Sequence, residues 1–288
     1  VPLDDVQEVS SYVAAMNHGL KRLREDDSPL SLRLIKEMHE VLLSKGRGSD
    51  KMPGEFRRSQ NWLGGTRPGN ARFVPPPPDH VADCMANLEK FLHDQPRRTP
   101  VLIKAALAHV QFETIHPFLD GNGRLGRLLI TLILCAEGAL AQPLLYLSLF
   151  FKQHRQEYYD RLDAVRLKGD WLGWLRFFLE GVEQTAKQAA DTTGNILALF
   201  DEDRAKVEDL GRKAGSAHRL LELLRRHPIM TIPNATGQLN LSAPTVRKAM
   251  EALADLSIVR EITGKQRDRI YIYDRYVSIL DEGTQPLS

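Results

Sequence analysis

The sequence has few cysteines, since Cys84 and Cys135 are the only two among 288 residues. So few thiols exclude a disulfide framework and favour a reducing compartment. Long apolar runs are also missing, because the longest, from Leu128 to Ala136, is far shorter than the roughly 20 residues that span a bilayer. The sequence begins Val-Pro-Leu-Asp-Asp and shows no basic segment followed by an apolar one, as a signal peptide would. We therefore expect a cytoplasmic protein without a membrane partner.

A large net charge is absent as well. Lys and Arg number 39 against 37 Asp and Glu, which gives a formal net charge of +2. This balance excludes a chain that is basic throughout and coats nucleic acid. The charge is unevenly spread, however, because residues 212–277 hold 12 Lys and Arg against 6 Asp and Glu. The composition therefore predicts a small basic module beside a mildly acidic body.

Apolar spacing predicts that residues 1–210 form an all-α body with one insertion. Residues 6–23 carry apolar side chains three and four apart, as one face of an amphipathic helix does. Prolines and glycines exclude a long helix in residues 53–78, where two short apolar pieces flank a Gly/Pro turn. We interpret this insertion as a β-hairpin or an irregular flap. Toward the end of the body we expect helices at 149–168, 171–190 and 192–210.

The pattern changes after residue 211. Three short helices are followed by two alternating segments, 258–262 and 269–273, which is the order of a winged helix-turn-helix domain over residues 211–277. Residues 278–288 read as an acidic tail. The side chains that would meet DNA are Thr245, Arg247, Lys248, Lys265, Arg267 and Arg269. The alternative is a module for dimerisation or protein contact. Glu251 and Asp255, which lie on the helix that would enter the DNA groove, favour this alternative.

The segment from His116 to Arg127, His-Pro-Phe-Leu-Asp-Gly-Asn-Gly-Arg-Leu-Gly-Arg, carries the most chemistry. Pro117 blocks helix continuation, and the two glycines of the turn at 120–123 let backbone N–H groups point at an anion. The next helix begins near Arg124, so the positive end of its dipole faces the same place. Arg124 and Arg127 lie on one helical face, and their guanidinium groups suit phosphate oxygens. The alternative is a polar turn between core helices, but a turn needs no His, Asp and two arginines at fixed offsets.

Two residues of this segment add reactivity to phosphate binding. Asp120 can hold Mg²⁺, a hard cation that shares its ligands with substrate phosphates. His116 is best placed to take a hydroxyl proton near neutral pH. The site itself has no cysteine and no paired serine and base for a covalent intermediate. We therefore expect a nucleotide-phosphate site with a general base at its lip that supports direct in-line attack.

The pattern His116-x-Phe118-x-Asp120-Gly-Asn-Gly-Arg124-x-x-Arg127 resembles the Fic family motif at every defined position. The resemblance covers about residues 1–210 and includes Gly-Glu-Phe-Arg at 54–57, four prolines at 75–78 and Glu-Tyr-Tyr at 157–159. It implies an all-α Fic-type core with an inserted β-hairpin flap, ahead of the small winged helix-turn-helix domain.

The resemblance also implies an activity, since Fic proteins mostly transfer AMP from ATP to a Ser, Thr or Tyr hydroxyl of a target protein and release pyrophosphate. His116 would deprotonate the target hydroxyl, and Asp120 would position Mg²⁺ between the α- and β-phosphates. Phe118 would anchor the loop in the core. The residues implied in ATP binding are Gly121, Asn122, Gly123, Arg124, Leu125, Gly126, Arg127, Tyr158 and Tyr159.

Within that set the implied roles differ. The backbone of 121–123 would cradle phosphates with help from the Asn122 side chain, and Arg124 and Arg127 would hold the β- and γ-phosphates. Tyr158 or Tyr159 would line the adenine side, with helix packing as the alternative. The flap residues Asn61, Trp62, Leu63 and Gly64 would align a target segment by strand-like pairing.

Many Fic proteins carry an inhibitory helix with the pattern (Ser or Thr)-x-x-x-Glu-(Gly or Asn), whose Glu pairs with the last arginine of the motif, here Arg127. Nothing before residue 50 matches, so we expect that helix to lie upstream of this sequence. One loose match, Ser278 to Gly283, lies beyond the winged helix, and we treat it as chance.

The sequence thus predicts a protein adenylyltransferase that uses ATP and Mg²⁺, modifies target proteins and itself, and forms a homodimer. Two alternatives stay open. One is another Fic-type reaction, such as transfer of phosphate or UMP, or removal of AMP. The other is a transcriptional regulator in which the helical body only senses nucleotide and the winged helix binds DNA.

Overall fold

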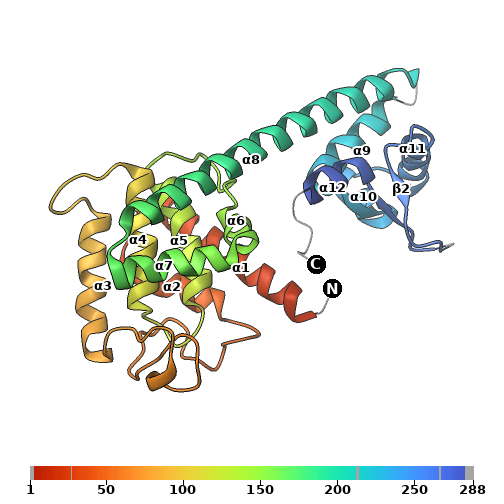
Figure 1. The fold of residues 1–288 in the computed structure, drawn as a ribbon. Coiled ribbons are helices and arrows are strands. Elements are labelled where there is room, and N and C mark those ends of the chain that lie inside the picture. The colour runs from red at the N-terminus through yellow and green to blue at the C-terminus, as the bar shows by residue number, and fades with distance from the viewer. Residues whose placement is uncertain (1–2, 27, 212–213, 266, 283–288) are drawn as a thin grey trace. The chain divides into compact units, whose positions relative to one another are not determined.

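The computed structural model describes residues 3–26, 28–211, 214–265 and 267–282. The chain is mostly helical and forms two compact units, Val1–Thr185 and Ala186–Ser288, whose boundary falls inside the long helix α8 (Figure 1). Within the described residues, no helix combines the length and the apolar character needed to cross a membrane.

The first unit is built around two adjacent helices, α4 and α5, which lie side by side (Figure 1). Most side chains of α4 are buried, because α3 and α5 both pack against it and aromatic residues cover the rest. Trp174, fully buried, donates its indole N–H to the carbonyl of Ala106 on α4 at 3.0 Å. The helices of this unit are α1 (Leu3–Arg24), α2 (Leu32–Leu42), α3 (Pro78–Leu92), α4 (Val101–Ile115), α5 (Asn122–Ala136), α6 (Leu147–Gln153), α7 (Arg155–Lys168) and the first part of α8 (Trp171–Glu208).

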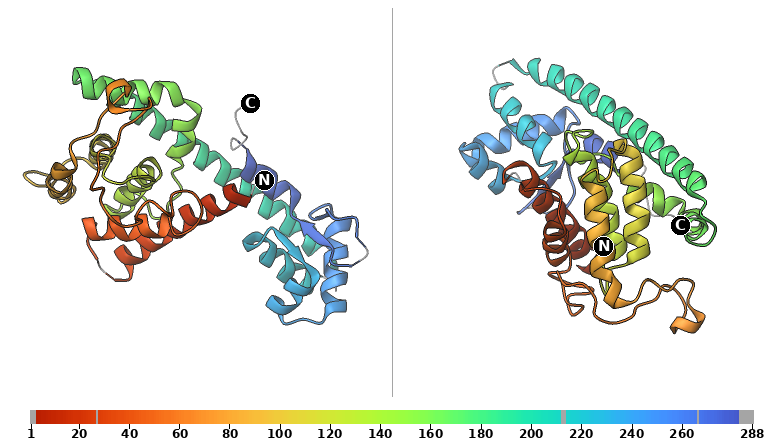
Figure 2. Two further views of the ribbon diagram at one scale, coloured as in Figure 1. Left: turned by 90° about the horizontal axis from the view of Figure 1, so that it is seen from below. Right: turned by 90° about the vertical axis from the view of Figure 1, so that its left-hand side faces the viewer.

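The insertion between α2 and α3 is an irregular flap rather than the β-hairpin of the predicted fold class. Figure 2 shows it in orange as a long loop. One isolated antiparallel bridge joins Leu63 to Phe73, and a short 3₁₀ turn, η1 (Pro68–Asn70), closes the loop between them. The side-chain oxygen of Asn70 accepts the N–H groups of Thr66 and Arg67. The hydrogen bonds of the turn are therefore made within the turn, and the Leu63–Phe73 bridge is not extended into a ladder.

Two predicted helix boundaries are wrong. The helix expected at 149–168 is divided at His154, which caps both α6 and α7 and whose ring nitrogen Nδ1 lies 3.0 Å from the Phe150 carbonyl. Conversely, the helices expected at 171–190 and 192–210 are one continuous helix, α8. Gly194 lies inside α8, which tolerates it because a single glycine costs a helix only about 1 kcal/mol.

The second unit combines short helices with a small antiparallel sheet of order β1-β3-β2. Ile272 on the central strand faces Ile229 on one side and Arg260 on the other. The sequence analysis missed β1 and α12, and α12 contains residues that we assigned to the acidic tail. Beyond α8, the elements are α9 (Ala214–Arg226), β1 (Ile229–Thr231), α10 (Ile232–Leu239), α11 (Ala243–Asp255), β2 (Arg260–Glu261), β3 (Ile270–Ile272) and α12 (Asp274–Asp281).

Candidate active site

The motif loop connects the C-terminal end of α4 to the N-terminal end of α5. His116 caps α4 in a left-handed conformation with φ 49°, and its backbone N–H donates to the Phe112 carbonyl at 2.9 Å. Gly121, at φ 79°, is the N-cap of α5. A Cβ at that glycine would lie 3.3 Å from Nε2 of His39, so the position requires glycine for both conformation and space. The loop thus places a histidine against the positive end of a helix.

Asn122 and His39 hold this loop in its conformation through contacts with Phe118 and Asp120. The Asn122 side chain accepts the N–H of Phe118 at 2.9 Å and donates to its carbonyl at 2.8 Å. It therefore braces the loop, and its amide is engaged there rather than open to a phosphate. The His39 ring stacks on the Phe118 ring with centroids 3.7 Å apart. Phe118 is fully buried, as the anchoring role requires.

The protonation of His39 follows from its two neighbours. The N–H of Gly54 donates to Nδ1 at 2.9 Å, so Nδ1 carries no proton. Nε2 therefore bears the proton and donates to the Asp120 carbonyl at 2.9 Å. Burial lowers the pKa of His39, which keeps this ring neutral and in one tautomer. Sequence reasoning missed His39, because nothing in its helical spacing separates it from the apolar residues of α2.

Arg57 clamps the loop from the flap side. This buried guanidinium donates to the His116 carbonyl at 2.9 Å, the Pro76 carbonyl at 2.5 Å and the Ile115 carbonyl at 3.3 Å. Its backbone N–H donates to the Pro117 carbonyl. A cation at the C-terminal end of α4 also opposes the negative end of the helix dipole. Arg57 lies in the Gly-Glu-Phe-Arg segment noted in the sequence, but its role was not predicted.

The predicted flap residues divide into braced and exposed positions. Asn61 donates its amide to the carbonyls of Phe118 at 3.1 Å and His116 at 3.3 Å, so it ties the flap to the motif loop. Leu63 carries the bridge, and Gly64 follows it at φ 67°. Trp62 stays 40% exposed. The flap therefore lies next to the loop that holds His116.

Two arginines and an aspartate lie at the start of α5: Arg124 and Arg127 belong to its first turns, and Asp120 directly precedes its N-cap. Arg124 donates Nη1 to Oε1 of Glu8 on α1 at 2.7 Å, and its Nη2 lies 3.7 Å from Oδ1 of Asp120. Arg127 makes no hydrogen bond or ion pair within the part of the chain that the structure describes. The backbone N–H groups at the start of α5 have no intrahelical acceptor, as in every helix. Together these groups form a cationic, donor-rich surface suited to phosphate oxygens.

Asp120 is the one carboxylate of the motif. Its Oδ1 accepts the N–H of Gly121 at 2.6 Å, and its side chain is partly exposed. Among the described residues, no group of three or more His, Cys, Asp and Glu side chains comes together as a metal cage. A single carboxylate fits Mg²⁺ in nucleotide sites, where one or two protein carboxylates act together with substrate phosphates and water.

Burial lowers the pKa of His116 to about 4, against an opposing contribution from the backbone of Glu113. The ring is therefore neutral at pH 7 and able to accept a proton. Its Nδ1 has no hydrogen-bond partner of normal geometry within the described residues and lies 3.8 Å from Oε2 of Glu113. Glu113 is buried as well, and sequence reasoning did not single it out.

The remaining predicted ATP-binding residues lie in different surroundings. Leu125 is buried in the core, and Gly126 lies against Glu113, because a Cβ there would be 2.6 Å from Oε1. Tyr158 is only 4% exposed and bonds to Nε2 of His109 at 2.8 Å, so its surroundings are those of helix packing. Tyr159 is 41% exposed and is the one of the two tyrosines that is open to a ligand.

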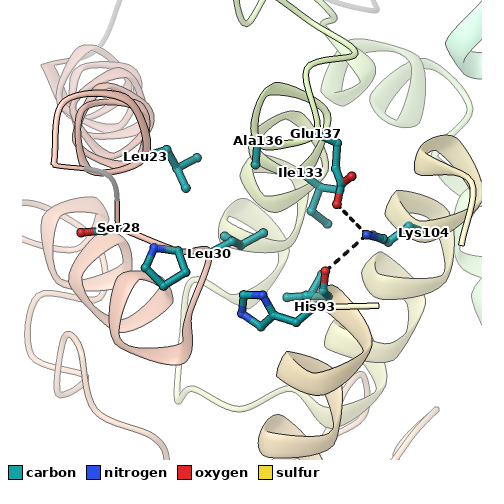
Figure 3. A pocket seen from close by; sticks show the side chains of 10 residues that line it. Leu23, Ser28, Leu30, His93, Lys104, Ile133, Ala136 and Glu137 are labelled. Carbon is teal, nitrogen blue, oxygen red and sulfur yellow. Dashed lines mark hydrogen bonds and ion pairs between the residues drawn. The ribbon is translucent and has the colours of Figure 1, made fainter. Parts of the chain in front are cut away.

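A separate cavity of about 370 Å³ lies between α1, α3, α4 and α5. Figure 3 shows Lys104 and Glu137 pointing toward each other at its edge. The buried Lys104 ammonium pairs with Asp94 at 2.8 Å and Glu137 at 2.5 Å. Its charge is satisfied within the protein, so we interpret the cluster as a structural tie between helices.

Fold and site together define a helical domain in which a buried histidine lies beside a cationic, donor-rich helix start, at the junction of two central helices. Residues 29–134 match the family model described as Fic/DOC family. This part of the chain, within the first unit, is therefore similar to the Fic/DOC family.

Curated relatives show the same similarity. The protein adenylyltransferase Fic of Aedes aegypti is 34% identical over 184 residues, which cover 64% of this chain and 34% of the relative. The protein of the same name from Culex quinquefasciatus is 32% identical over the same shares of each chain. The matched region thus spans about a third of the length of these relatives.

Solved structures agree on the fold. A Fic family protein from Desulfovibrio desulfuricans G20 superposes with a TM-score of 0.57 at 22% identity, covering 94% of this chain and 76% of its own. A Fic domain containing signaling protein from Bacteroides thetaiotaomicron gives a TM-score of 0.53 at 20% identity, covering 66% and 72%. At such identities the likeness concerns the fold alone.

Proposed function

We propose that this chain is a protein adenylyltransferase that transfers AMP from ATP to hydroxyl side chains of target proteins and of itself. The observation that carries the proposal is the position of a neutral, buried His116 four residues before Asp120 and next to the donor-rich start of α5. The names of the curated relatives support the same reaction class.

The chain's own groups account for phosphate binding. The free N–H groups of α5 and the guanidinium of Arg127 would neutralise the triphosphate, which lowers the cost of charge in the transition state. Arg124 would add a second cation once Glu8 gives way to phosphate oxygens. Mg²⁺, held by Asp120 and the phosphates, would withdraw electron density from the reacting phosphoryl group.

Proton transfer falls to His116. Its Nε2 would take the proton of the target hydroxyl while the hydroxyl oxygen attacks the α-phosphorus and the bond to the pyrophosphate oxygen breaks. Because its pKa lies well below 7, the ring is already unprotonated when the target arrives. The backbone of the flap at 61–64 would hold the target segment beside this ring by strand addition.

Labelled ATP tests the proposal. With ATP labelled at the α-phosphate we expect label on the protein itself and on added target proteins, and with ATP labelled at the γ-phosphate we expect none. His116→Ala abolishes the label, whereas His80→Ala, at an exposed histidine on α3, retains it. Label from the γ-phosphate alone would contradict adenylyl transfer and indicate a kinase.

The C-terminal module supports a second proposal, that residues 211–277 are a winged helix-turn-helix that contacts DNA. Arg247 and Lys248 on α11 are exposed, as are Lys265 and Arg267 between β2 and β3. Within the described residues none of the four forms an ion pair, so they are open to phosphates. Duplex binding that weakens steeply with salt and is lost when all four become Ala supports the proposal, and salt-independent binding contradicts it.

We also propose that the protein acts as a homodimer in a reducing, cytoplasmic compartment, where its two free cysteines stay reduced. Light scattering of the purified chain measures its mass in solution. A mass of one chain at micromolar concentration would contradict the dimer.

A further inference from the structure

Glu113 stands out as a buried carboxylic acid without a hydrogen-bond partner for one of its oxygens. It lies one turn before His116 on α4, and its residue exposure is 6%. Oε1 is completely buried and makes no hydrogen bond within the described residues. An unpaired buried carboxyl costs folding free energy. Its presence next to the motif loop therefore indicates a function other than stabilising the fold.

Its surroundings place it under the reacting groups. Oε2 lies 3.8 Å from Nδ1 of His116, and Oε1 lies against Gly126 at the start of α5. Arg127 from α5, and Arg166 and Tyr158 from α7, are the other charged or titratable groups that act on it. Arg166 is engaged elsewhere, since it bonds to the Glu113 backbone carbonyl, to Asp163 and to Thr114.

The chemistry of His116 requires an acceptor at this place. An imidazole that receives a proton at Nε2 must already carry its first proton at Nδ1, and that N–H needs an oxygen to point at. The structure places Oε2 of Glu113 3.8 Å from Nδ1, and the backbone carbonyl of the same residue, which also acts on this ring, already accepts a hydrogen bond from Arg166. Hydrogen bonds of catalytic groups are often long before substrate binds and shorten in the reactive complex, as a 3.8 Å separation allows.

We propose that Glu113 is a positioning residue that accepts the Nδ1–H of His116 and so holds the histidine in the tautomer that acts as a base at Nε2. This inference rests on the proposed function of His116. Either protonation state of Glu113 suffices, because the carbonyl oxygen of a neutral carboxyl accepts a hydrogen bond as a carboxylate does. When Nε2 takes the hydroxyl proton, the same contact stabilises the imidazolium.

Two variants of equal length separate the acceptor from the charge. Glu113→Gln keeps an acceptor oxygen and removes the charge, whereas Glu113→Met removes both. We expect Glu113→Gln to retain kcat within about tenfold and Glu113→Met to lose about 10²-fold in kcat, with KM for ATP unchanged in both. A merely structural role predicts the opposite order, with Glu113→Met at least as stable and as active as Glu113→Gln. An apolar residue in place of an unpaired buried carboxyl leaves the protein as stable or more so.

A second readout needs no activity. With ¹⁵N-labelled histidine in the full chain, the ring nitrogen shifts of His116, assigned by their loss in His116→Ala, report its tautomer at pH 7. We expect the proton on Nδ1 in the wild type and in Glu113→Gln, and a shift toward Nε2 in Glu113→Met. Unfolding temperatures show whether both variants fold. If Glu113→Met does not fold, the tautomer of His116 in Glu113→Gln decides the question.

The proposal is overturned if His116 keeps its tautomer in Glu113→Met, if that variant retains kcat within threefold, or if Glu113→Gln changes the tautomer. Failure of the proposed function looks different. In that case the wild type transfers no label from ATP, and the tautomer measurement still reports whether Glu113 holds Nδ1.

Discussion

Glu8, near the start of α1, accepts a hydrogen bond at 2.7 Å from Nη1 of Arg124, the first arginine of the motif. The Arg124 side chain is 14% exposed, and that of Glu8 is 44% exposed. Of the two arginines expected to bind phosphate, Arg124 is thus already paired with a carboxylate, whereas Arg127 forms no ion pair within the described residues. A phosphate would have to displace Glu8 to obtain both cations.

We predict that Glu8→Gln lowers KM for ATP by about threefold. A partly exposed ion pair contributes about 0.2–1 kcal/mol, which sets the scale of the gain when the competing carboxylate is removed. Steady-state kinetics of self-modification measure the change. The control is Glu25→Gln, just beyond the same helix, which is exposed and forms no ion pair within the described residues. A rise in KM would show that Glu8 helps to orient Arg124.

Arg57→Lys should destabilise the first unit by about 3 kcal/mol, because an ammonium cannot reach the carbonyls of Ile115, His116 and Pro76 together. Urea unfolding followed by circular dichroism gives the free energy. The neighbouring Arg58 is exposed, so Arg58→Lys is the matched control and should change stability by less than about 0.5 kcal/mol. Equal effects of the two substitutions would argue against the clamp.

Alanine substitutions at two glycines with similar backbone angles distinguish the cost of backbone strain from an effect on ATP binding. Gly121 and Gly138 have φ 79° and 72°, so alanine should cost about 1–2 kcal/mol at each. A Cβ at Gly121 meets His39 and Leu43, whereas one at Gly138 meets nothing within 4 Å. We expect Gly121→Ala to weaken ATP binding at least tenfold and Gly138→Ala to leave it unchanged, as calorimetric titration would measure. Equal ATP affinities would contradict the role of the loop.

The stability of the protein should fall in acid because of buried neutral histidines. Burial lowers the pKa of His116 to about 4 and that of His109 to about 3, whereas both titrate near 6.5 when unfolded. The unfolded chain therefore binds more protons below pH 6.5. The stability from each group is present above that pH and is lost as pH falls toward the folded value.

For His116 the loss amounts to about 3 kcal/mol between pH 6.5 and 4, at about 1.4 kcal/mol per unit of pKa. Urea unfolding across that range measures it. His116→Asn should flatten the profile relative to the wild type, and His80→Asn, at an exposed site, should not. A profile unchanged by His116→Asn would show that this ring is not held neutral by burial.

The sequence predicts the motif loop well because its conformation is local. The proline after His116 indicates where α4 ends, and the glycines of the turn place the start of α5 near Arg124, two residues after its observed start at Asn122. The flap was harder to predict. Its short apolar pieces resemble a hairpin, but Asn70 closes the turn with its own side chain, and only the bridge between Leu63 and Phe73 forms.

The supporting residues of the site could not be predicted because their roles depend on contacts between distant segments. His39 and Arg57 precede the motif by 59 residues or more and touch it only in the fold. Asn122 shows the same limit from within the motif, since its amide binds Phe118 although the resemblance assigned it to phosphate. Tyr158 likewise faces His109 in the interior, which spacing alone cannot distinguish from a ligand-facing position.

Mass spectrometry of the protein after incubation with ATP and Mg²⁺ tests the central claim most directly. The account predicts a covalent AMP adduct on a Ser, Thr or Tyr side chain, present in the wild type and in His80→Ala and absent from His116→Ala. A wild-type protein that binds ATP but gains no adduct on itself or on any added protein would contradict it, as would an AMP adduct that persists in His116→Ala.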